Sequence, residues 1–288
     1  MSSEVQVRRI LPRGLDKFDL DRLCLHTDII FVVGKRGTGK TTLIRSILRH
    51  HRHRIDFLVV MSGSEKANRA YQHMMVPRVC IRHKFDATYL QEIYNEVASG
   101  KTRGKSGKAA RVVFVFDDLA FGGNTFWGNE TIRNIMFMGR HYQIGIMFAV
   151  QYIMHIPLEC RSQYNYAFTM QDNAFDTLER LRKVFFSFIR KDDDFQTVLQ
   201  YFTAQFGVLV SVGACNDPEL TRCMNWFRAK QDTRLFLVGS AEYRLLYSPS
   251  QLVHYNEARR KRPHVRRAAF SPMGSQSGRA TPESLSVR

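Results

Sequence analysis

The sequence lacks the features that would direct it to a membrane or to an oxidising compartment. It has no apolar run near the ~20 residues of a membrane span, and its first residues, MSSEVQVRR, lack the apolar core of a signal peptide. Cysteine is scarce. The five cysteines are widely spaced and form no CxxC pair: Cys24, Cys80, Cys160, Cys215 and Cys223. This usage predicts free thiols in a soluble, intracellular protein, without a zinc site or a disulfide framework.

Acidic residues are few relative to basic ones. The 288 residues contain 26 Asp and Glu against 43 Lys and Arg, a formal net charge of +17. Residues 259–288 hold eight Lys and Arg and one acid, which leaves +10 on the rest of the chain. An excess of this size favours a polyanionic partner, nucleic acid or a membrane surface, over a merely solvated basic face.

The chain is organised around residues 29–46, IIFVVGKRGTGKTTLIRS. An apolar strand, a glycine loop of the form GxxxxGK[ST] and a helical apolar pattern follow one another, as a P-loop requires. The glycines allow successive N–H groups to turn inward around a polyphosphate. We expect Lys40 to reach the β- and γ-phosphates and Thr41 to hold Mg²⁺. The predicted nucleotide-binding residues are Gly34, Lys35, Arg36, Gly37, Thr38, Gly39, Lys40, Thr41 and Thr42.

A second apolar run, residues 112–116, ends in two carboxylates, Asp117 and Asp118. A magnesium ion at the P-loop needs a carboxylate at the end of an adjacent strand, and we assign this role to Asp117. A second carboxylate is needed to polarise the attacking water, and we assign it to Asp118. Gln151 ends a further apolar run, residues 144–150, where it could sense the γ-phosphate, hold the lytic water or simply cap the strand.

The remaining apolar spacing predicts a mainly parallel α/β sheet flanked by helices. Residues 1–257 are expected to form one P-loop domain, and residues 258–288 a basic, disordered tail. The sequence predicts a basic surface loop over 99–108. Further strands are expected at 57–61, 79–81, 165–170 and 207–212, the last as the final core strand, with a hairpin of 235–238 and 243–247. Helices are expected at 88–97, 175–188 and 195–202.

Four segments together resemble the genome-packaging ATPases of nucleocytoplasmic large DNA viruses, a branch of the FtsK/HerA group of additional-strand P-loop motors. They are GKRGTGKT, VVFVFDDL, GRHYQIGIMFAVQY and IPLECRSQYNYAF. The resemblance covers roughly residues 28–170 and extends to the stretch 206–212. It implies a RecA-like fold, ATP and Mg²⁺ as cofactors, and Arg140 or Arg161 as an arginine that acts on a neighbouring subunit's nucleotide. Asp118 departs from the wider group, in which many relatives have Glu at this position.

The same resemblance implies a homo-oligomeric ring, a hexamer or pentamer, that pumps double-stranded DNA into a capsid. Capsid or membrane proteins at the packaging site would be further partners, and the host cytoplasm, a viral factory or the virion would be its location. From the residues alone, Arg140 could equally form a surface ion pair. Two other functions keep the P-loop: a small-molecule kinase, and a nucleic-acid-binding protein switched by nucleotide without turnover. The basic tail could tether DNA, act as a localisation signal or aid solubility.

Overall fold

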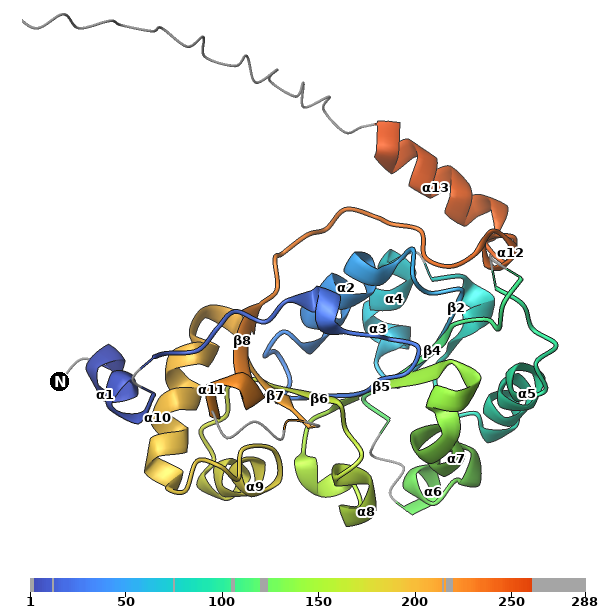
Figure 1. Cartoon of the computed structure of the whole chain (residues 1–288). Coiled ribbons are helices and arrows are strands. Elements are labelled where there is room, and N and C mark those ends of the chain that lie inside the picture. Colours follow the sequence, from blue (N-terminus) through green and yellow to red (C-terminus); the bar gives the residue numbers. More distant parts are fainter. Residues whose placement is uncertain are drawn as a thin grey trace, which may run out of the picture.

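An eight-stranded sheet with helices on both faces organises the part of the chain that the structure describes (Figure 1). The structure is a computed structural model, and it describes residues 3–11, 13–74, 76–104, 107–119, 124–213, 215 and 220–260. The strands lie in the order β3-β2-β4-β5-β1-β6-β7-β8. Their bounds are β1 Ile29–Val33, β2 Phe57–Ser62, β3 Ile81–Arg82, β4 Val112–Asp117, β5 Ile144–Val150, β6 Tyr166–Thr169, β7 Gly207–Val212 and β8 Met224–Arg228.

The six strands from β3 to β6 in this order run parallel, whereas β7 is antiparallel to both β6 and β8. Strands β1, β4 and β5 are buried throughout and apolar except for Asp117 at the end of β4, because helices cover both faces of the sheet. The carboxyl ends of the parallel strands meet at one edge. This arrangement confirms the predicted mainly parallel α/β fold.

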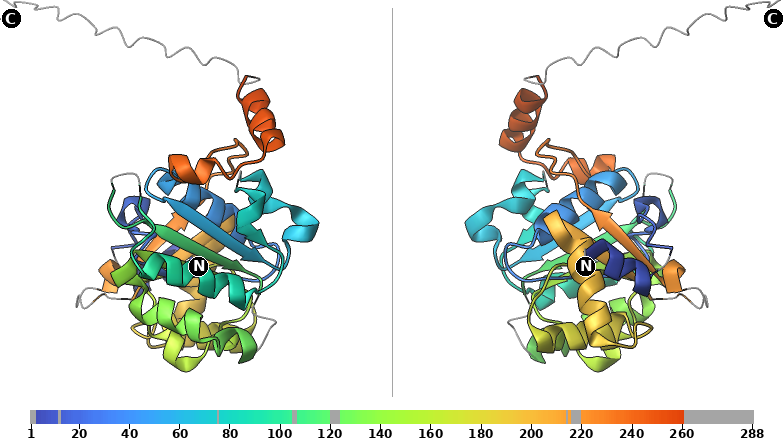
Figure 2. Two further views of the ribbon diagram at one scale, coloured as in Figure 1. Left: turned by 90° about the vertical axis from the view of Figure 1, so that its right-hand side faces the viewer. Right: turned by 90° about the vertical axis from the view of Figure 1, so that its left-hand side faces the viewer.

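Helices form one layer on each face of the sheet (Figures 1 and 2). In Figure 1, α2, α3 and α4 lie above the sheet, whereas α6, α7, α8 and α9 lie below it. The helix bounds are α1 Ser3–Ile10, α2 Lys40–His51, α3 Glu65–Asn68, α4 Ala70–His73, α5 Ala87–Ala98, α6 Asn124–Trp127, α7 Glu130–Met138, α8 Leu158–Arg161, α9 Phe175–Phe185, α10 Asp192–Thr203, α11 Leu220–Cys223, α12 Ala241–Arg244 and α13 Pro249–Arg260.

Alternation along the strands divides the core into two layers. On one face, Phe31 of β1 stacks on Phe148 of β5 with 5.3 Å between ring centroids, and Phe185 of α9 packs against them. On the other face, Val32 of β1 packs with Leu43 of α2 in a second buried cluster. The segment before β1 also packs here, since four of its apolar side chains are buried in this second cluster. They are Phe18, Leu20, Leu23 and Leu25.

The parallel strands and the longer helices lie close to their predicted bounds, but the chain after β7 differs. Residues 207–212 form a strand as predicted, yet β8 follows it and completes the sheet. The predicted hairpin of 235–238 and 243–247 is wrong, because α12 occupies part of it and 235–238 form no strand. Tyr243, within α12, and Tyr247, shortly after it, are both buried. Ser240 caps α12 by accepting a hydrogen bond from the Tyr243 N–H. The apolar character of the two tyrosines is compatible with a strand as well as with a buried helical turn.

Smaller differences concern helix ends and the short edge strand. Helix α10 begins at Asp192, three residues before its predicted start, since the acids of its first turn complement the helix dipole. Helix α9 ends at Phe185 and not at residue 188. The strand expected at 79–81 is a 3-10 turn, Arg78–Cys80, followed by the two-residue β3.

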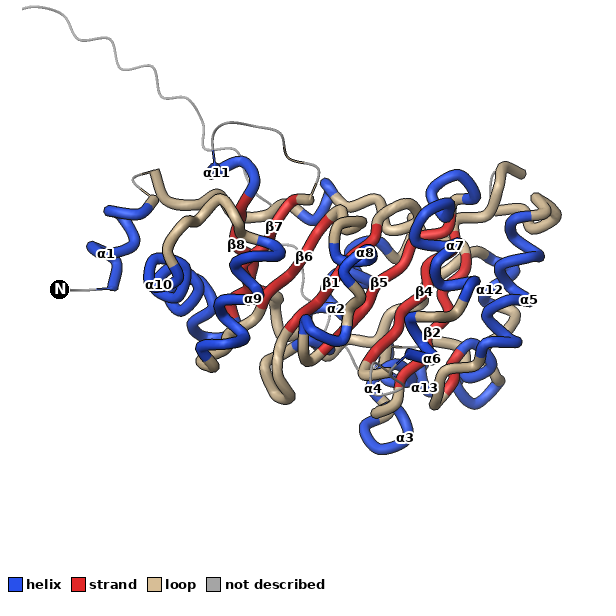
Figure 3. Tube along the Cα trace, turned by 90° about the horizontal axis from the view of Figure 1, so that it is seen from below, coloured by secondary structure: helices blue, strands red, loops and turns tan. Residues whose placement is uncertain are grey.

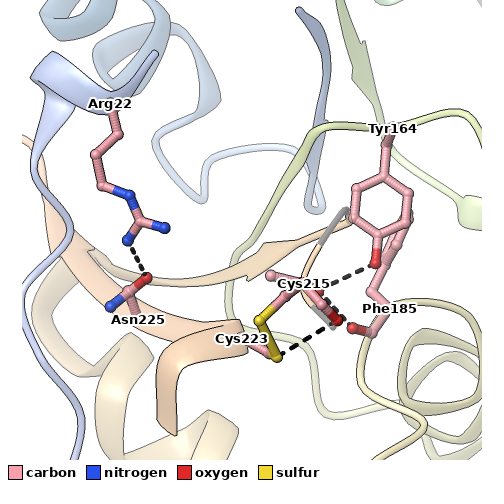
Figure 4. Close-up of a disulfide and its surroundings, with 7 residues drawn as sticks. Arg22, Tyr164, Phe185, Cys215, Cys223 and Asn225 are labelled. Carbon is pink, nitrogen blue, oxygen red and sulfur yellow. Dashed lines mark hydrogen bonds between the residues drawn. A yellow bond between two sulfur atoms is a disulfide. The ribbon is translucent and has the colours of Figure 1, made fainter. Parts of the chain in front are cut away.

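The prediction that all cysteines are free thiols is wrong for two of them. Cys215 and Cys223 form a disulfide, with their Cα atoms 5.3 Å apart (Figure 4). They lie on the connection between the antiparallel strands β7 and β8, and the pairing of these strands brings the two ends of the connection together. A separation of eight residues without a CxxC pattern gave no sign of this contact. Cys24, Cys80 and Cys160 are free.

The predicted tail lies mostly outside the described residues. Helix α13 continues to Arg260, and residues 261–288 are not described. The same holds for residues 105 and 106 of the predicted basic loop. Within the described ranges, no helix is both long enough and apolar enough to cross a membrane.

Candidate active site

The loop between β1 and α2 has the backbone geometry of a phosphate cradle. Gly37 and Gly39 have φ values of 83° and 99°, a left-handed region that glycine adopts without a steric penalty. Gly39 is the N-cap of α2, so the free N–H groups of the first helical turn face the loop. The loop therefore offers backbone donors and the positive end of a helix dipole to one anion.

Lys40, the first residue of α2, turns back over the loop. Its Nζ donates hydrogen bonds to Gly34 O at 2.6 Å and to Lys35 O at 3.1 Å. The side chain is buried, and burial lowers the pKa of Lys40, whereas Asp118 and Asp117 raise it. This ammonium group is held at the centre of the loop by neutral carbonyls, which phosphate oxygens can replace.

Lys35 connects the P-loop to the segment that follows the carboxyl end of β6. Its Nζ lies 2.7 Å from Asp172 Oδ1, and this buried carboxylate also accepts a hydrogen bond from the Ala174 N–H at 2.8 Å. Thr38 contributes a second link, because its hydroxyl lies 3.1 Å from Met170 Sδ. The loop is thus fixed to the segment after β6. Arg36 is exposed, and Thr41 and Thr42 are half-buried in the first turn of α2.

Asp117 ends β4 in a buried environment and has a single hydrogen-bond donor described for its side chain. The hydroxyl of Tyr71 donates to Asp117 Oδ2 at 3.0 Å. Burial raises the pKa of Asp117 to about 6, and the Tyr71 hydrogen bond opposes this rise. Tyr71 is itself held by Glu65, whose carboxylate accepts hydrogen bonds from the N–H groups of Tyr71 and Gln72, both at 2.9 Å.

Asp118 lies one residue further, with a φ of 58°. Its N–H donates to Ala149 O at 3.1 Å, and its Oδ1 accepts a hydrogen bond from Gln151 Nε2 at 2.5 Å. A Cβ atom on Gly63 would lie 2.9 Å from Asp118 O, so the end of β2 closely backs this residue. Left-handed backbone at a non-glycine residue is costly and is concentrated at functional sites.

The structure brings together most of the residues that the sequence selected for the site. The P-loop follows β1, Gln151 follows the adjacent β5, and Asp117 ends β4 on the far side of β5. All three strands end at the same edge of the sheet (Figure 3). Tyr71 and Glu65 were missed, because a buried tyrosine and glutamate in a short helical stretch carry no pattern that separates them from core residues.

The two candidate arginines lie elsewhere. Arg140 is exposed in the 3-10 turn Gly139–Tyr142 before β5, so this strand separates it from Gln151 by about 20 Å at ~3.3 Å per residue. Arg161, in α8, donates from Nε to Ile156 O at 2.7 Å. Neither arginine contacts Asp117 or Asp118 in the described part of the chain.

The oxygen ligands available at the site fit a magnesium ion. Hard cations of this size prefer oxygen ligands, and Mg²⁺ keeps several waters while it bridges one or two protein groups to substrate phosphates. The Asp117 carboxylate is buried and accepts one described hydrogen bond, from Tyr71. Thr41 carries its hydroxyl in the first turn of α2. The described residues contain no cluster of three or more His, Cys, Asp or Glu that would hold a metal by itself. The set therefore suits a metal shared with a nucleotide.

A P-loop after the first strand, acids at the end of β4 and two antiparallel strands beyond β6 define a P-loop NTPase fold of the RecA-like kind with additional strands. The family model described as Poxvirus A32 protein matches residues 15–198. The chain belongs to this family, and the resemblance to viral ATPases predicted from its motifs is confirmed.

Individual relatives come from large DNA viruses. The chain is 33% identical over 144 residues to Uncharacterized protein 015R of Frog virus 3 (isolate Goorha), a match that covers 50% of this chain and 44% of that protein. It is 24% identical over 219 residues to Uncharacterized protein 088R of Invertebrate iridescent virus 3, covering 75% of this chain and 82% of that protein.

A solved structure shares the fold at low sequence identity. It is the genome packaging NTPase B204 from Sulfolobus turreted icosahedral virus 2 in complex with AMPPCP. The two are 14% identical with a TM-score of 0.51, and the match covers 71% of this chain and 98% of B204.

Proposed function

We propose that the protein is an ATP-driven motor that moves double-stranded viral DNA into a capsid. One observation carries the hydrolytic step: the 2.5 Å contact between Gln151 Nε2 and Asp118 Oδ1 at the strand ends beside the P-loop. The amide offers a donor and an acceptor, and the carboxylate offers acceptors only. Together they can orient one water and accept its proton as it attacks the terminal phosphate.

The other residues divide the work of binding. Lys40 would exchange two neutral carbonyl partners for phosphate oxygens, and hydrogen bonds to a charged acceptor are roughly twice as strong. The loop N–H groups and the start of α2 would hold the rest of the polyphosphate. Asp117 and Thr41 would hold Mg²⁺, which when bound neutralises charge that develops on the phosphates. Tyr71 would fix the orientation of Asp117.

The charge of the chain supports DNA as the partner. Residues 1–258 carry +10, so the basic tail does not account for the whole excess. Neutralising DNA phosphates releases counterions, and affinity for duplex DNA should therefore fall steeply with salt. The packaging role named for B204 supports the same function here.

We also propose a homo-oligomeric ring, a pentamer or hexamer. Arg140 is exposed at the edge of the sheet opposite the P-loop, away from this subunit's own nucleotide site, so we assign it to the nucleotide of a neighbouring subunit, with Arg161 as the alternative. Action in the host cytoplasm or viral factory, with capsid proteins as docking partners, follows from the same function. Size measurement by light scattering, with and without ATP and duplex DNA, tests the ring: a monomer under all conditions contradicts it.

DNA-stimulated ATPase activity of the full chain tests the motor. We expect Lys40→Ala and Asp118→Asn each to lower the stimulated rate by roughly 100-fold or more, the scale of general acid–base and charge-stabilising contributions. Lys183→Ala is the matched control, since this lysine pairs with Glu179 on the surface of α9. ATPase activity that does not increase with DNA, or that is retained in Lys40→Ala, excludes the motor. Phosphate transfer to a nucleoside would indicate a kinase, and binding without steady-state ADP release would indicate a switch.

A further inference from the structure

A constrained turn in front of β7 presents an aromatic ring to solvent. Gln205 and Phe206 have φ values of 53° and 62°, and the Phe206 side chain is 62% exposed. Two successive non-glycine residues in the left-handed region are costly, so the surrounding structure must impose the turn. Arg228 does so from β8: its guanidinium donates to Ala204 O at 3.1 Å and to Gln205 Oε1 at 3.4 Å.

The residue after the ring also fixes the turn. A Cβ atom on Gly207 would lie 2.0 Å from Phe202 O, so the chain passes too close to the end of α10 for any side chain. The backbone is therefore closely confined on both sides of Phe206. An exposed ring on a confined backbone is pre-positioned for a contact with something outside the chain.

The ring lies next to the P-loop. A Cβ atom on Gly39 would lie 3.6 Å from Phe206 Cδ1, which is ordinary van der Waals contact. The register explains this proximity: Thr169, the last residue of β6, pairs with Leu209, so Gly207 lies beyond the carboxyl end of β6. Phe206 thus reaches the nucleotide edge from the antiparallel strand.

The sheet order fixes the direction in which a nucleotide would lie. The acids and Gln151 follow β4 and β5, on one side of β1, whereas β6 and β7 are on the other side (Figure 3). A terminal phosphate beside Asp118 and a polyphosphate across the loop leave the nucleoside to emerge toward β7. The ring at the start of β7 stands where a base would arrive.

We propose that Phe206 is a base-binding residue, whose ring stacks on the purine base of the bound nucleoside triphosphate. This inference rests on the proposed function, because it needs the terminal phosphate at Asp118. Bases stack on aromatic side chains through their π-faces, which every base has. Phe206 would therefore raise affinity for ATP and GTP alike and would not choose between them.

Calorimetric titration of the full chain with a non-hydrolysable ATP analogue and with inorganic tripolyphosphate tests the inference. We expect Phe206→Ala to weaken the nucleotide by about tenfold, which is within the range for loss of one stacked base, and to leave tripolyphosphate within about twofold. Phe206→Trp should retain nucleotide affinity. Phe175→Ala is the matched control, because Phe175 is also 62% exposed but begins α9, on the face of the sheet opposite α2.

Each other outcome counts against the proposal in a recognisable way. Unchanged nucleotide affinity in Phe206→Ala overturns it. An equal loss for nucleotide and tripolyphosphate also overturns it, since the turn would then shape the phosphate cradle and not the base site. Wild-type protein that binds neither ligand overturns the proposed function itself, and this inference with it.

Discussion

Tyr71→Phe tests how the structure holds the carboxylate of Asp117, the proposed magnesium ligand. The change removes one oxygen from a fully buried ring and leaves its packing intact. What is lost is the 3.0 Å hydrogen bond to Asp117 Oδ2. A hydrogen bond to a charged group contributes about 1.5–3 kcal/mol, and 1.4 kcal/mol is a factor of ten. Because this bond is also present without the metal, only the part of its energy that orients the carboxylate toward Mg²⁺ affects binding, and we expect the Mg²⁺ concentration for half-maximal ATPase activity to rise by about tenfold.

Activity titrated with Mg²⁺ at saturating ATP measures this effect, and Mn²⁺ binding followed by electron paramagnetic resonance gives a second readout without turnover. Tyr243→Phe is the matched control, since Tyr243 is equally buried and its hydroxyl donates to Leu58 O at 2.5 Å, away from the site. It should lower thermal stability and leave the Mg²⁺ dependence unchanged. A folded Tyr71→Phe protein with wild-type Mg²⁺ dependence refutes the reasoning.

Two further predictions concern stability. Gly145→Ala should lower the free energy of unfolding by about 3 kcal/mol or more, because the new Cβ would lie 1.8 Å from Leu25 O. Urea denaturation measures this free energy, and a decrease below about 1 kcal/mol contradicts the prediction. Burial lowers the pKa of His51 from 6.5 to about 4 in the folded protein. As the pH falls below 6.5, the histidine is therefore protonated in the unfolded chain but not in the folded one. The stability that is present above pH 6.5 is lost as the pH falls toward 4. Between pH 7 and pH 5 this histidine should cost about 2 kcal/mol, and His51→Gln should remove that part of the pH dependence; identical profiles for variant and wild type would exclude it.

Much of the site could be predicted from the sequence, because its parts lie at the ends of buried parallel strands. Continuous apolar runs that end in glycine, an acid or glutamine predict β1, β4 and β5, and the ends of parallel strands must meet at one edge. The last strand of the sheet, β8, could not be predicted from the sequence. Strand β8 is short, with polar or charged residues at two of its five positions, Asn225 and Arg228, and it is a strand because β7 offers it an open edge. The Cys215–Cys223 disulfide depends on the same pairing.

Backbone strain links the residues that pattern could not reveal. The described non-glycine residues with positive φ are Arg69, Asp118, Gln143, Gln205 and Phe206. Asp118 lies at the end of the site where the terminal phosphate is proposed to lie, and Gln205 and Phe206 lie at the end where the base is proposed to lie. Arg69 makes the bend between α3 and α4 that lets the Glu65 carboxylate accept the Tyr71 N–H, and Tyr71 in turn holds Asp117. Such conformations persist only where the surrounding structure imposes them. Four of the five therefore lie at the proposed nucleotide site or in the short series of contacts that holds Asp117.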